Sequence, residues 1–194
     1  MRVDFTKEEK NRLEAFCARR KLRVKGFIAK GHSSRIFLVQ KGRKKLVAKV
    51  ERTDSSRKHM LEREAFNLKL ANSKHIGPTL FIYDFFYRIL LMEYIKGETF
   101  EEWIFSKKRK KGEVSLFVRE LLKQGEKLDS LGLDHGQLAG RGANILVRKG
   151  KPVIIDFEKA STRRKCHNRA VLEAFLFRNK KSAVAKRIGK ILNA

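Results

Sequence analysis

Four polar side chains in this sequence are of the types that handle phosphate groups and divalent cations. Lys49 ends an apolar, strand-like run, and Glu64 follows on a segment with helical periodicity. Further along, Asn144 begins one short apolar run and Asp156 lies near the end of the next. A lysine ammonium can reach a phosphate, and amide and carboxylate oxygens are hard ligands that suit Mg²⁺. These residue types favour chemistry on a phosphate group held together with a magnesium ion.

The spacing of the helical segment selects Glu64 as the partner of Lys49. Glu64 lies one turn after Leu61 and one turn before Leu68, at the rim of the apolar stripe. Glu62 is rotated by about 200° from Glu64 around the same helix. A solvated helix glutamate is the alternative, but the position of Glu64 beside the stripe favours an ion pair with Lys49.

The elements that must position these residues begin with a small sheet. Residues 6 to 20 have the periodicity of an amphipathic helix. Residues 24 to 50 alternate like three antiparallel strands separated by the turn signals GHSS and KGRK. Residues 57 to 72 return to helical spacing, and two further apolar runs follow Pro78. The first half therefore predicts a sheet with helices.

The second half of the chain is mainly helical. Thr99 starts a short helix, and apolar residues from Val114 to Leu131 mark a long amphipathic one. Two apolar runs around Gly150 predict a hairpin, and two basic helices complete the sequence. The chain as a whole is expected to belong to the α+β class.

The order of these motifs resembles that of protein kinases: glycine turn, strand lysine, helix glutamate, apolar strand ending in Met-Glu-Tyr, His-Gly loop, asparagine and Asp-Phe. The phrases Arg-Glu-Ala, Ile-Gly-Pro and Asp-Phe-Glu are similar to RIO-type kinases and to the kinase of the KEOPS complex. The resemblance implies a two-lobed, protein-kinase-like fold with a reduced C-terminal lobe. It places a helical extension at residues 1–22, the N-terminal lobe at 23–95 and the C-terminal lobe at 96–194.

The resemblance also implies that ATP and Mg²⁺ are the cofactors. The turn at Gly31 and Ser34, together with Lys49, would face the phosphates, since small residues let backbone amides approach them. The metal ligands would be Asn144 and Asp156. The residues implied around the adenine ring are Ile36, Val47, Met92 and Leu146, with backbone groups of Glu93 and Ile95 as the hinge contacts. A buried strand end explains the Met-Glu-Tyr segment equally well.

The catalytic loop departs from the family pattern. Kinases carry an acid after His-X, with the metal asparagine five residues later, whereas this chain has Gln137 and places Asn144 seven residues beyond it. The longer loop contains Gly140 and Gly142. An amide cannot accept a proton at neutral pH, although Gln137 could orient a hydroxyl group or water. Asp134 could replace the missing base if the loop bends to present it.

The charge of the chain predicts a polyanionic partner. Lysine and arginine number 47 against 21 acidic residues, which gives a net charge of +26. RNA, a ribonucleoprotein or an acidic protein surface is therefore expected as a partner. The basic run at 107–111 fits this expectation, although a solvated loop is its commonest explanation. No apolar run approaches the roughly 20 residues of a membrane span, so we expect a soluble, cytoplasmic protein.

Three classes of function remain open from the sequence. One is an ATP-dependent enzyme, either a serine/threonine phosphotransferase or an ATPase switch. A second is a catalytically silent nucleotide-binding module that acts on RNA or a ribonucleoprotein. A third is an RNA-binding protein whose kinase-like motif order is vestigial; in that case Lys49, Glu64 and Asp156 would tolerate alanine.

Overall fold

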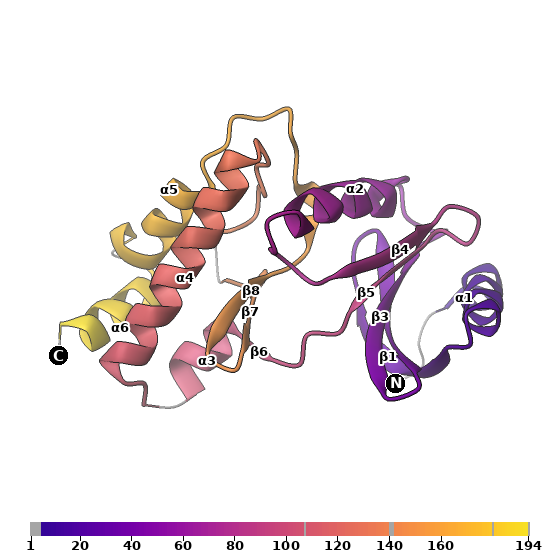
Figure 1. The fold of residues 1–194 in the computed structure, drawn as a ribbon, viewed down its shortest axis with the longest axis horizontal. Helices are drawn as coiled ribbons and strands as arrows, with labels where there is room; N and C mark the ends of the chain where they lie inside the picture. The colour runs from indigo at the N-terminus through magenta and orange to yellow at the C-terminus, as the bar shows by residue number, and fades with distance from the viewer. Residues whose placement is uncertain (1–4, 107, 140–141, 180, 194) are drawn as a thin grey trace. The chain divides into compact units, whose positions relative to one another are not determined.

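The computed structural model describes residues 5–106, 108–139, 142–179 and 181–193, and its two sheets are antiparallel (Figure 1). The α+β class expected from the sequence is confirmed. The chain divides into two compact units. Unit 1 comprises Met1–Lys69 with Pro78–Tyr94, and unit 2 comprises Leu70–Gly77 with Ile95–Ala194.

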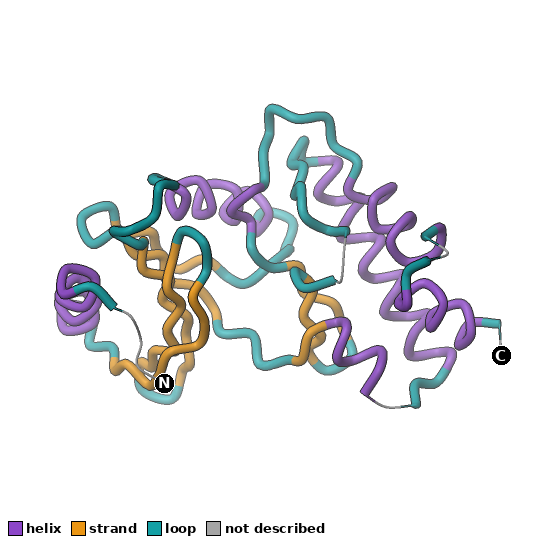
Figure 2. Tube along the Cα trace, turned by 180° about the vertical axis from the view of Figure 1, so that it is seen from behind, coloured by secondary structure: helices purple, strands orange, loops and turns teal. Residues whose placement is uncertain are grey.

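Unit 1 is built on a five-stranded sheet in the order β1-β2-β3-β5-β4, with two helices on it. Figure 2 colours these strands orange and the helices purple. The three antiparallel strands expected over residues 24–50 and the helix that follows them are confirmed. The elements are α1 (Lys7–Arg19), β1 (Arg23–Lys30), β2 (Ser34–Lys41), β3 (Lys44–Glu51), α2 (Met60–Asn72), β4 (Leu80–Asp84) and β5 (Ile89–Glu93).

One face of this sheet forms the core of unit 1 together with α1. Because side chains alternate along a strand, Ala48 and Val50 of β3 point to the same face. They pack there with Phe16 and Cys17 of α1. Burial raises the pKa of the Cys17 thiol to about 11. The N-terminal helix, which the sequence placed in a separate extension at residues 1–22, therefore contributes to the core.

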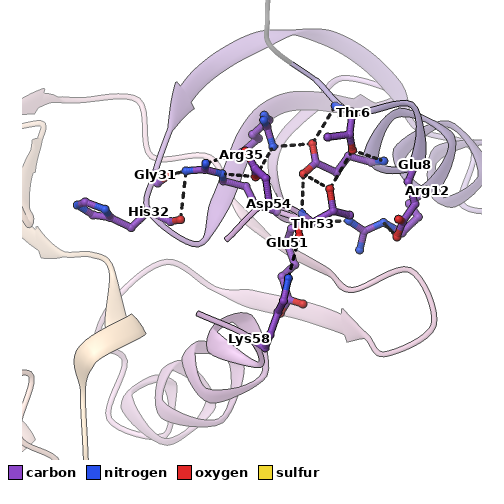
Figure 3. Close-up of polar contacts among 12 residues, drawn as sticks. Thr6, Glu8, Arg12, Gly31, His32, Arg35, Glu51, Thr53, Asp54 and Lys58 are labelled. Carbon is purple, nitrogen blue, oxygen red and sulfur yellow. Dashed lines mark hydrogen bonds and ion pairs between the residues drawn. The ribbon is translucent and has the colours of Figure 1, made fainter. Parts of the chain in front are cut away.

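A buried ion pair joins α1 to this face. Arg35 Nη1 donates to Glu9 Oε2 over 2.5 Å, and the two side chains are 1% and 0% exposed. Glu9 Oε1 accepts the Thr53 backbone N–H at 2.7 Å, and Thr6 and Glu9 form a capping box at the start of α1. Figure 3 shows Thr6, Thr53 and Arg35 converging in this network. Three segments that are distant in sequence are thus held together by one carboxylate.

Unit 2 is a helical assembly with a small three-stranded sheet. Its elements are β6 (Glu98–Thr99), α3 (Phe100–Ser106), α4 (Lys111–Ser130), β7 (Ile145–Arg148), β8 (Lys151–Ile154), a 3₁₀ turn η1 (Phe157–Lys159), α5 (Asn168–Glu173), a π-turn η2 (Ala174–Arg178) and α6 (Ala183–Leu192). Phe117 stacks against both Phe100 and Trp103, with ring centroids 4.9 and 4.7 Å away. This aromatic stack ties α3 to α4.

Two expectations for unit 2 need correction, while the hairpin around Gly150 is confirmed. The long helix begins at Lys111, inside the basic run rather than after it. The following basic helix is short and continues as a π-turn from Ala174. None of the helices in the described ranges is long and apolar enough to cross a membrane.

We predict that Glu9→Gln destabilises unit 1 by about 3 kcal/mol, because it leaves the buried Arg35 cation with only Asp54 as counter-charge, 3.7 Å away and 41% exposed. Urea unfolding followed by circular dichroism measures this change. Glu8→Gln is the matched control, since Glu8 is exposed in the same first turn of α1. Its effect should stay within about 0.5 kcal/mol. Equal midpoints for the two variants would contradict a structural role for the buried pair.

Candidate functional site

The strand register of unit 1 brings four of the proposed nucleotide residues to one face of the sheet. Lys49 lies opposite Ile36 on β2 and opposite Leu90 on β5. Val47, two residues before Lys49, lies opposite Met92. Residues directly opposite in an antiparallel pair point to the same side of the sheet. Ile36, Val47, Lys49 and Met92 therefore share the face that is turned away from α1.

Lys49 and Glu64 form a buried ion pair on this face. Lys49 Nζ lies 2.6 Å from Glu64 Oε1, and the side chains are 6% and 1% exposed. Glu62, the other acidic residue considered on α2, is exposed. A lysine ammonium is costly to bury unless it is paired and hydrogen-bonded. The pair therefore sets the position of the Lys49 ammonium relative to the sheet.

The glycine turn is short and is held by an arginine that the sequence analysis did not single out. Gly31 N–H donates to Ser34 O at 2.8 Å, so β1 and β2 are joined by three residues. Arg52 Nη1 donates to the carbonyl oxygens of Gly31 and His32 at 2.9 and 3.2 Å. In Figure 3 the side chain of His32 points away from this network. Arg52 thus holds the backbone of the turn through its carbonyl oxygens.

Asp54 in turn orients Arg52. Its two carboxylate oxygens accept from Arg52 Nε and Nη2, both at 2.9 Å. These hydrogen bonds hold the pKa of Asp54 far below its usual range. A bidentate pair of this kind fixes the plane of the guanidinium as well as its position. No sequence motif marks Arg52, because it is one of many basic residues.

The two proposed hinge residues lie in different units. Glu93 is the last residue of β5, and its N–H donates to Thr79 O at 2.8 Å. Its carboxylate accepts both the N–H and the hydroxyl of Thr79 at 3.1 Å. Ile95 is buried and begins the second segment of unit 2. The Met-Glu-Tyr segment is therefore both a strand end and the place where the chain leaves unit 1.

In unit 2, the hairpin positions the two proposed metal ligands. Ile155 N–H donates to Asn144 O at 2.9 Å, which extends the β7–β8 ladder by one step. Asn144 therefore lies beside the residue that precedes Asp156. Leu146 is half-buried, whereas its neighbours in β7, Ile145 and Val147, are buried, as alternation requires.

Asp156 has an unusual backbone. Its φ of +66° is in the left-handed region, which aspartate enters more readily than most residues. Strained positions of this type occur often at functional sites. A carboxylate oxygen of Asp156 and one of Glu158 lie within 4.8 Å of each other. Asn144 Nδ2 donates to Gln137 O at 3.1 Å, so the amide oxygen of Asn144 remains as the possible cation ligand.

The loop before the hairpin is anchored by His135. Its ring lies 4.9 Å from that of Phe157, and its Nε2 lies 3.0 Å from Ile155 O. Because a carbonyl oxygen only accepts, Nε2 carries the proton. Burial lowers the pKa of His135, opposed by the Ile155 hydrogen bond and by the charges of nearby aspartates. Among the described residues, Nδ1 is buried without a hydrogen-bond partner, which fits a neutral imidazole.

The carboxylate of Asp134 is engaged elsewhere. Its Oδ2 accepts from Arg164 Nε at 2.7 Å, and its backbone exchanges two hydrogen bonds with Ser161. Gln137 is half-buried, and its carbonyl oxygen receives the Asn144 amide. The loop thus ties Asp134 to a cation and joins Gln137 to a proposed metal ligand.

The remainder of the stretched loop is described only in part. Gly140 and the basic residue Lys107 lie outside the described residues. Gly142 has a φ of +72°, and an added Cβ would lie 2.9 Å from the Phe100 ring. A glycine is therefore required where this loop meets the aromatic core.

Asn168 is a second functional candidate that the sequence analysis missed. Its Oδ1 accepts the His135 N–H at 2.9 Å, and its Nδ2 donates to Leu133 O and Asp129 Oδ1. The Asp129 carboxylate also accepts the N–H groups of Asn168 and Arg169 at the start of α5. Asn168 therefore holds the loop backbone on both sides of Asp134. An asparagine at a helix start is a common capping signal, which carries no information about this tertiary role.

No protein-family model matches this chain. The chain is similar to the uncharacterized protein MJ1211 of Methanocaldococcus jannaschii, with 34% identity over 102 residues. The aligned region covers 53% of this chain and 84% of that protein.

We predict that acid destabilises unit 2 through His135. Since burial depresses its pKa, the unfolded chain binds a proton at higher pH than the folded chain does. Stability is then full above about pH 6.5 and falls below it, by at most about 1.4 kcal/mol per pH unit. Urea unfolding at pH 7.5 to 5.5, followed by fluorescence of the single tryptophan, Trp103, measures this dependence in unit 2.

His135→Gln should flatten the pH dependence of unfolding, whatever its effect on the stability itself. His75→Gln is the matched control, because His75 is exposed in the same unit and should leave the slope unchanged. A wild-type slope retained in His135→Gln would rule out His135 as the titrating group.

Proposed function

We propose that this chain, which belongs to the same family as the uncharacterized protein MJ1211, is a kinase-like protein that binds ATP and Mg²⁺. Its fold is that of a two-lobed kinase with a reduced C-terminal lobe, and its activity is that of an atypical serine/threonine phosphotransferase or an ATPase. The observation that carries the proposal is the buried Lys49–Glu64 pair. It lies on the sheet face that also presents Ile36, Val47 and Met92.

The roles on this face follow from its chemistry. A lysine fixed by a buried glutamate presents its ammonium to phosphate oxygens in one orientation. Apolar side chains on the same sheet face suit one face of a purine ring. The short turn at Gly31 and Ser34 brings backbone close to the phosphates, and Arg52 keeps that turn in place.

The donor set of unit 2 fits a magnesium ion. Asn144 and Asp156 offer an amide and a carboxylate oxygen, which are the hard ligands that Mg²⁺ takes with waters and phosphates. Bound Mg²⁺ would neutralise charge on the phosphate oxygens. The hairpin holds the backbone of Asn144 through the Ile155 N–H, and the left-handed backbone at Asp156 sets the direction in which its side chain leaves the chain.

The residue at the general-base position, Gln137, favours slow phosphate transfer. Gln137 can orient an attacking hydroxyl or water but cannot take its proton. Asp134 is ion-paired with Arg164, which argues against its acting as the substitute base. A catalytically silent nucleotide-binding module is the second candidate function, and the same absence of an acid at position 137 favours it.

The basic composition supports a polyanionic partner for either function. With a net charge of +26, RNA, a ribonucleoprotein or an acidic protein is the partner class that we propose, in the cytoplasm.

ATP with Mg²⁺ should raise the melting temperature of the wild-type protein, because a ligand selective for the folded state stabilises it. At 100 times the dissociation constant the gain is about 2.7 kcal/mol. Lys49→Ala and Asp156→Ala should remove the shift. Lys45→Ala is the matched control, since Lys45 is exposed on the same strand as Lys49. No shift at millimolar ATP, or an unchanged shift in both variants, would refute the nucleotide assignment.

Gln137→Asp should raise ATP turnover, measured as phosphate release, because it restores an acid at the base position. A positioned general base contributes about 10²- to 10⁴-fold. Asp134→Asn should have little effect, since the carboxylate of Asp134 is already engaged by Arg164.

The opposite pattern would assign the base to Asp134: turnover lost in Asp134→Asn and indifferent to Gln137→Asp. A wild-type rate in the range of ordinary kinases, about 1–100 s⁻¹, would end the idea of impaired catalysis. ATP binding without turnover in both wild type and Gln137→Asp would favour the silent module.

A further inference from the structure

A basic hollow of about 660 Å³ lies in unit 1, on the side of the sheet that carries α1. Its floor is apolar and includes the buried side chains of Leu22, Leu46 and Leu91. Five cationic side chains line it: Arg19, Arg20, Lys21, Lys41 and Lys44. They come from the end of α1, the end of β2 and the start of β3. No acidic residue is among the lining residues.

Four of these five cations have no acidic partner among the described residues. Arg20 pairs with Asp84 at 3.0 Å and lies over the Phe16 ring. No carboxylate of the described chain lies within ion-pair distance of Arg19, Lys21, Lys41 or Lys44, and all four are exposed. Unneutralised cations around an apolar floor create a positive field that attracts an anionic group.

An aromatic side chain is presented at the same hollow. Phe81 is 41% exposed, and Lys44 Nζ lies 4.1 Å from its ring centroid. The register between β4 and β5 shifts between Leu80 and Ile82, so Phe81 sits at an irregularity of an edge strand. Such irregularities re-aim a side chain and are common next to functional sites.

The end of α1 adds a strained residue to the rim. Lys21 has a φ of +55°, a left-handed conformation that glycine usually adopts just after the end of a helix. Its neighbour Leu22 donates its N–H to Cys17 O at 2.9 Å and returns the chain to the core. A lysine in place of glycine keeps one more cation at the hollow at some conformational cost.

We propose that this hollow is a binding site for single-stranded RNA. One base would lie on the apolar floor against Phe81, and the flanking phosphates would contact Arg19, Lys21, Lys41 and Lys44. Proteins bind single strands by this combination of an aromatic platform and a positive groove. The carboxylates of an acidic peptide would pair with the cations, but they would not bind the exposed phenylalanine ring or the leucine floor. The inference deepens the polyanion part of the proposed function and rests on that part, while ATP binding is tested separately.

The test is fluorescence anisotropy with a labelled 15-nucleotide single-stranded RNA of mixed sequence, at 50 to 300 mM KCl. The hollow variant combines Arg19→Gln, Lys21→Gln, Lys41→Gln and Lys44→Gln. The control variant makes the same charge change in unit 2, at four exposed lysines: Lys127→Gln, Lys165→Gln, Lys181→Gln and Lys190→Gln. Circular dichroism confirms that each variant is folded.

The hollow variant should bind at least about 30-fold more weakly than wild type, and the control variant at most about 5-fold. The slope of log K against log salt should become shallower by up to about 3 in the hollow variant, at roughly 0.7 per lost phosphate contact. Phe81→Ala should weaken binding by about 5- to 10-fold without a change of slope, and Phe81→Tyr should restore it.

Equal losses in the hollow and control variants would show diffuse binding and overturn the proposal. Duplex RNA bound as tightly as the single strand, or polyglutamate competing as well as RNA at equal charge, would also overturn it, the latter in favour of an acidic protein partner. If wild type binds no RNA at 50 mM KCl, RNA is removed from the proposed partner class as well. A thermal shift with ATP would then still stand on its own.

Discussion

The structure of unit 1 depends on the rule that a buried charge must have its counter-charge. Arg35 lies opposite Val50 in the β2–β3 register and points to the α1 face, whereas Lys49 points to the other face. In the described part of unit 1, each face buries one of these two cations, and each cation meets a glutamate from the helix on its side, Glu9 from α1 and Glu64 from α2. Replacing either glutamate would leave a charge in a region with little water. The two pairs thus fix both helices against the β2–β3 hairpin.

The sequence could predict the pair at Lys49 but not the one at Arg35. The pair at Lys49 is readable because the motif order resembles that of kinases and the helical spacing then selects Glu64 rather than Glu62. Arg35 stands next to a turn in a chain with 47 basic residues, and nothing local separates it from a solvated arginine. Glu9 is the third helical residue in the capping box of Thr6, but the same carboxylate also accepts hydrogen bonds from Arg35 and Thr53.

In the loop of unit 2, too, some contacts were predictable from the sequence and others were not. The hairpin that places Asn144 beside Ile155 follows from apolar alternation around Gly150, so its existence was predictable. The anchoring of that loop by Asn168 is a contact between residues 33 positions apart, and no short-range pattern encodes it. The π-helical turn at Ala174 was missed because π segments are rare and occur mostly as single turns within α-helices, so five residues are too few for a periodic pattern to reveal one.

The Glu9–Arg35 contact also constrains how the chain folds as it is synthesised. Glu9 leaves the ribosome 26 residues ahead of Arg35 and 44 ahead of Thr53. A helix of 13 residues has little stability in isolation, so α1 cannot persist until its partners appear. The sheet and the helix must therefore assemble together. Although α1 is synthesised before β2 and β3, it reaches its final place only together with them.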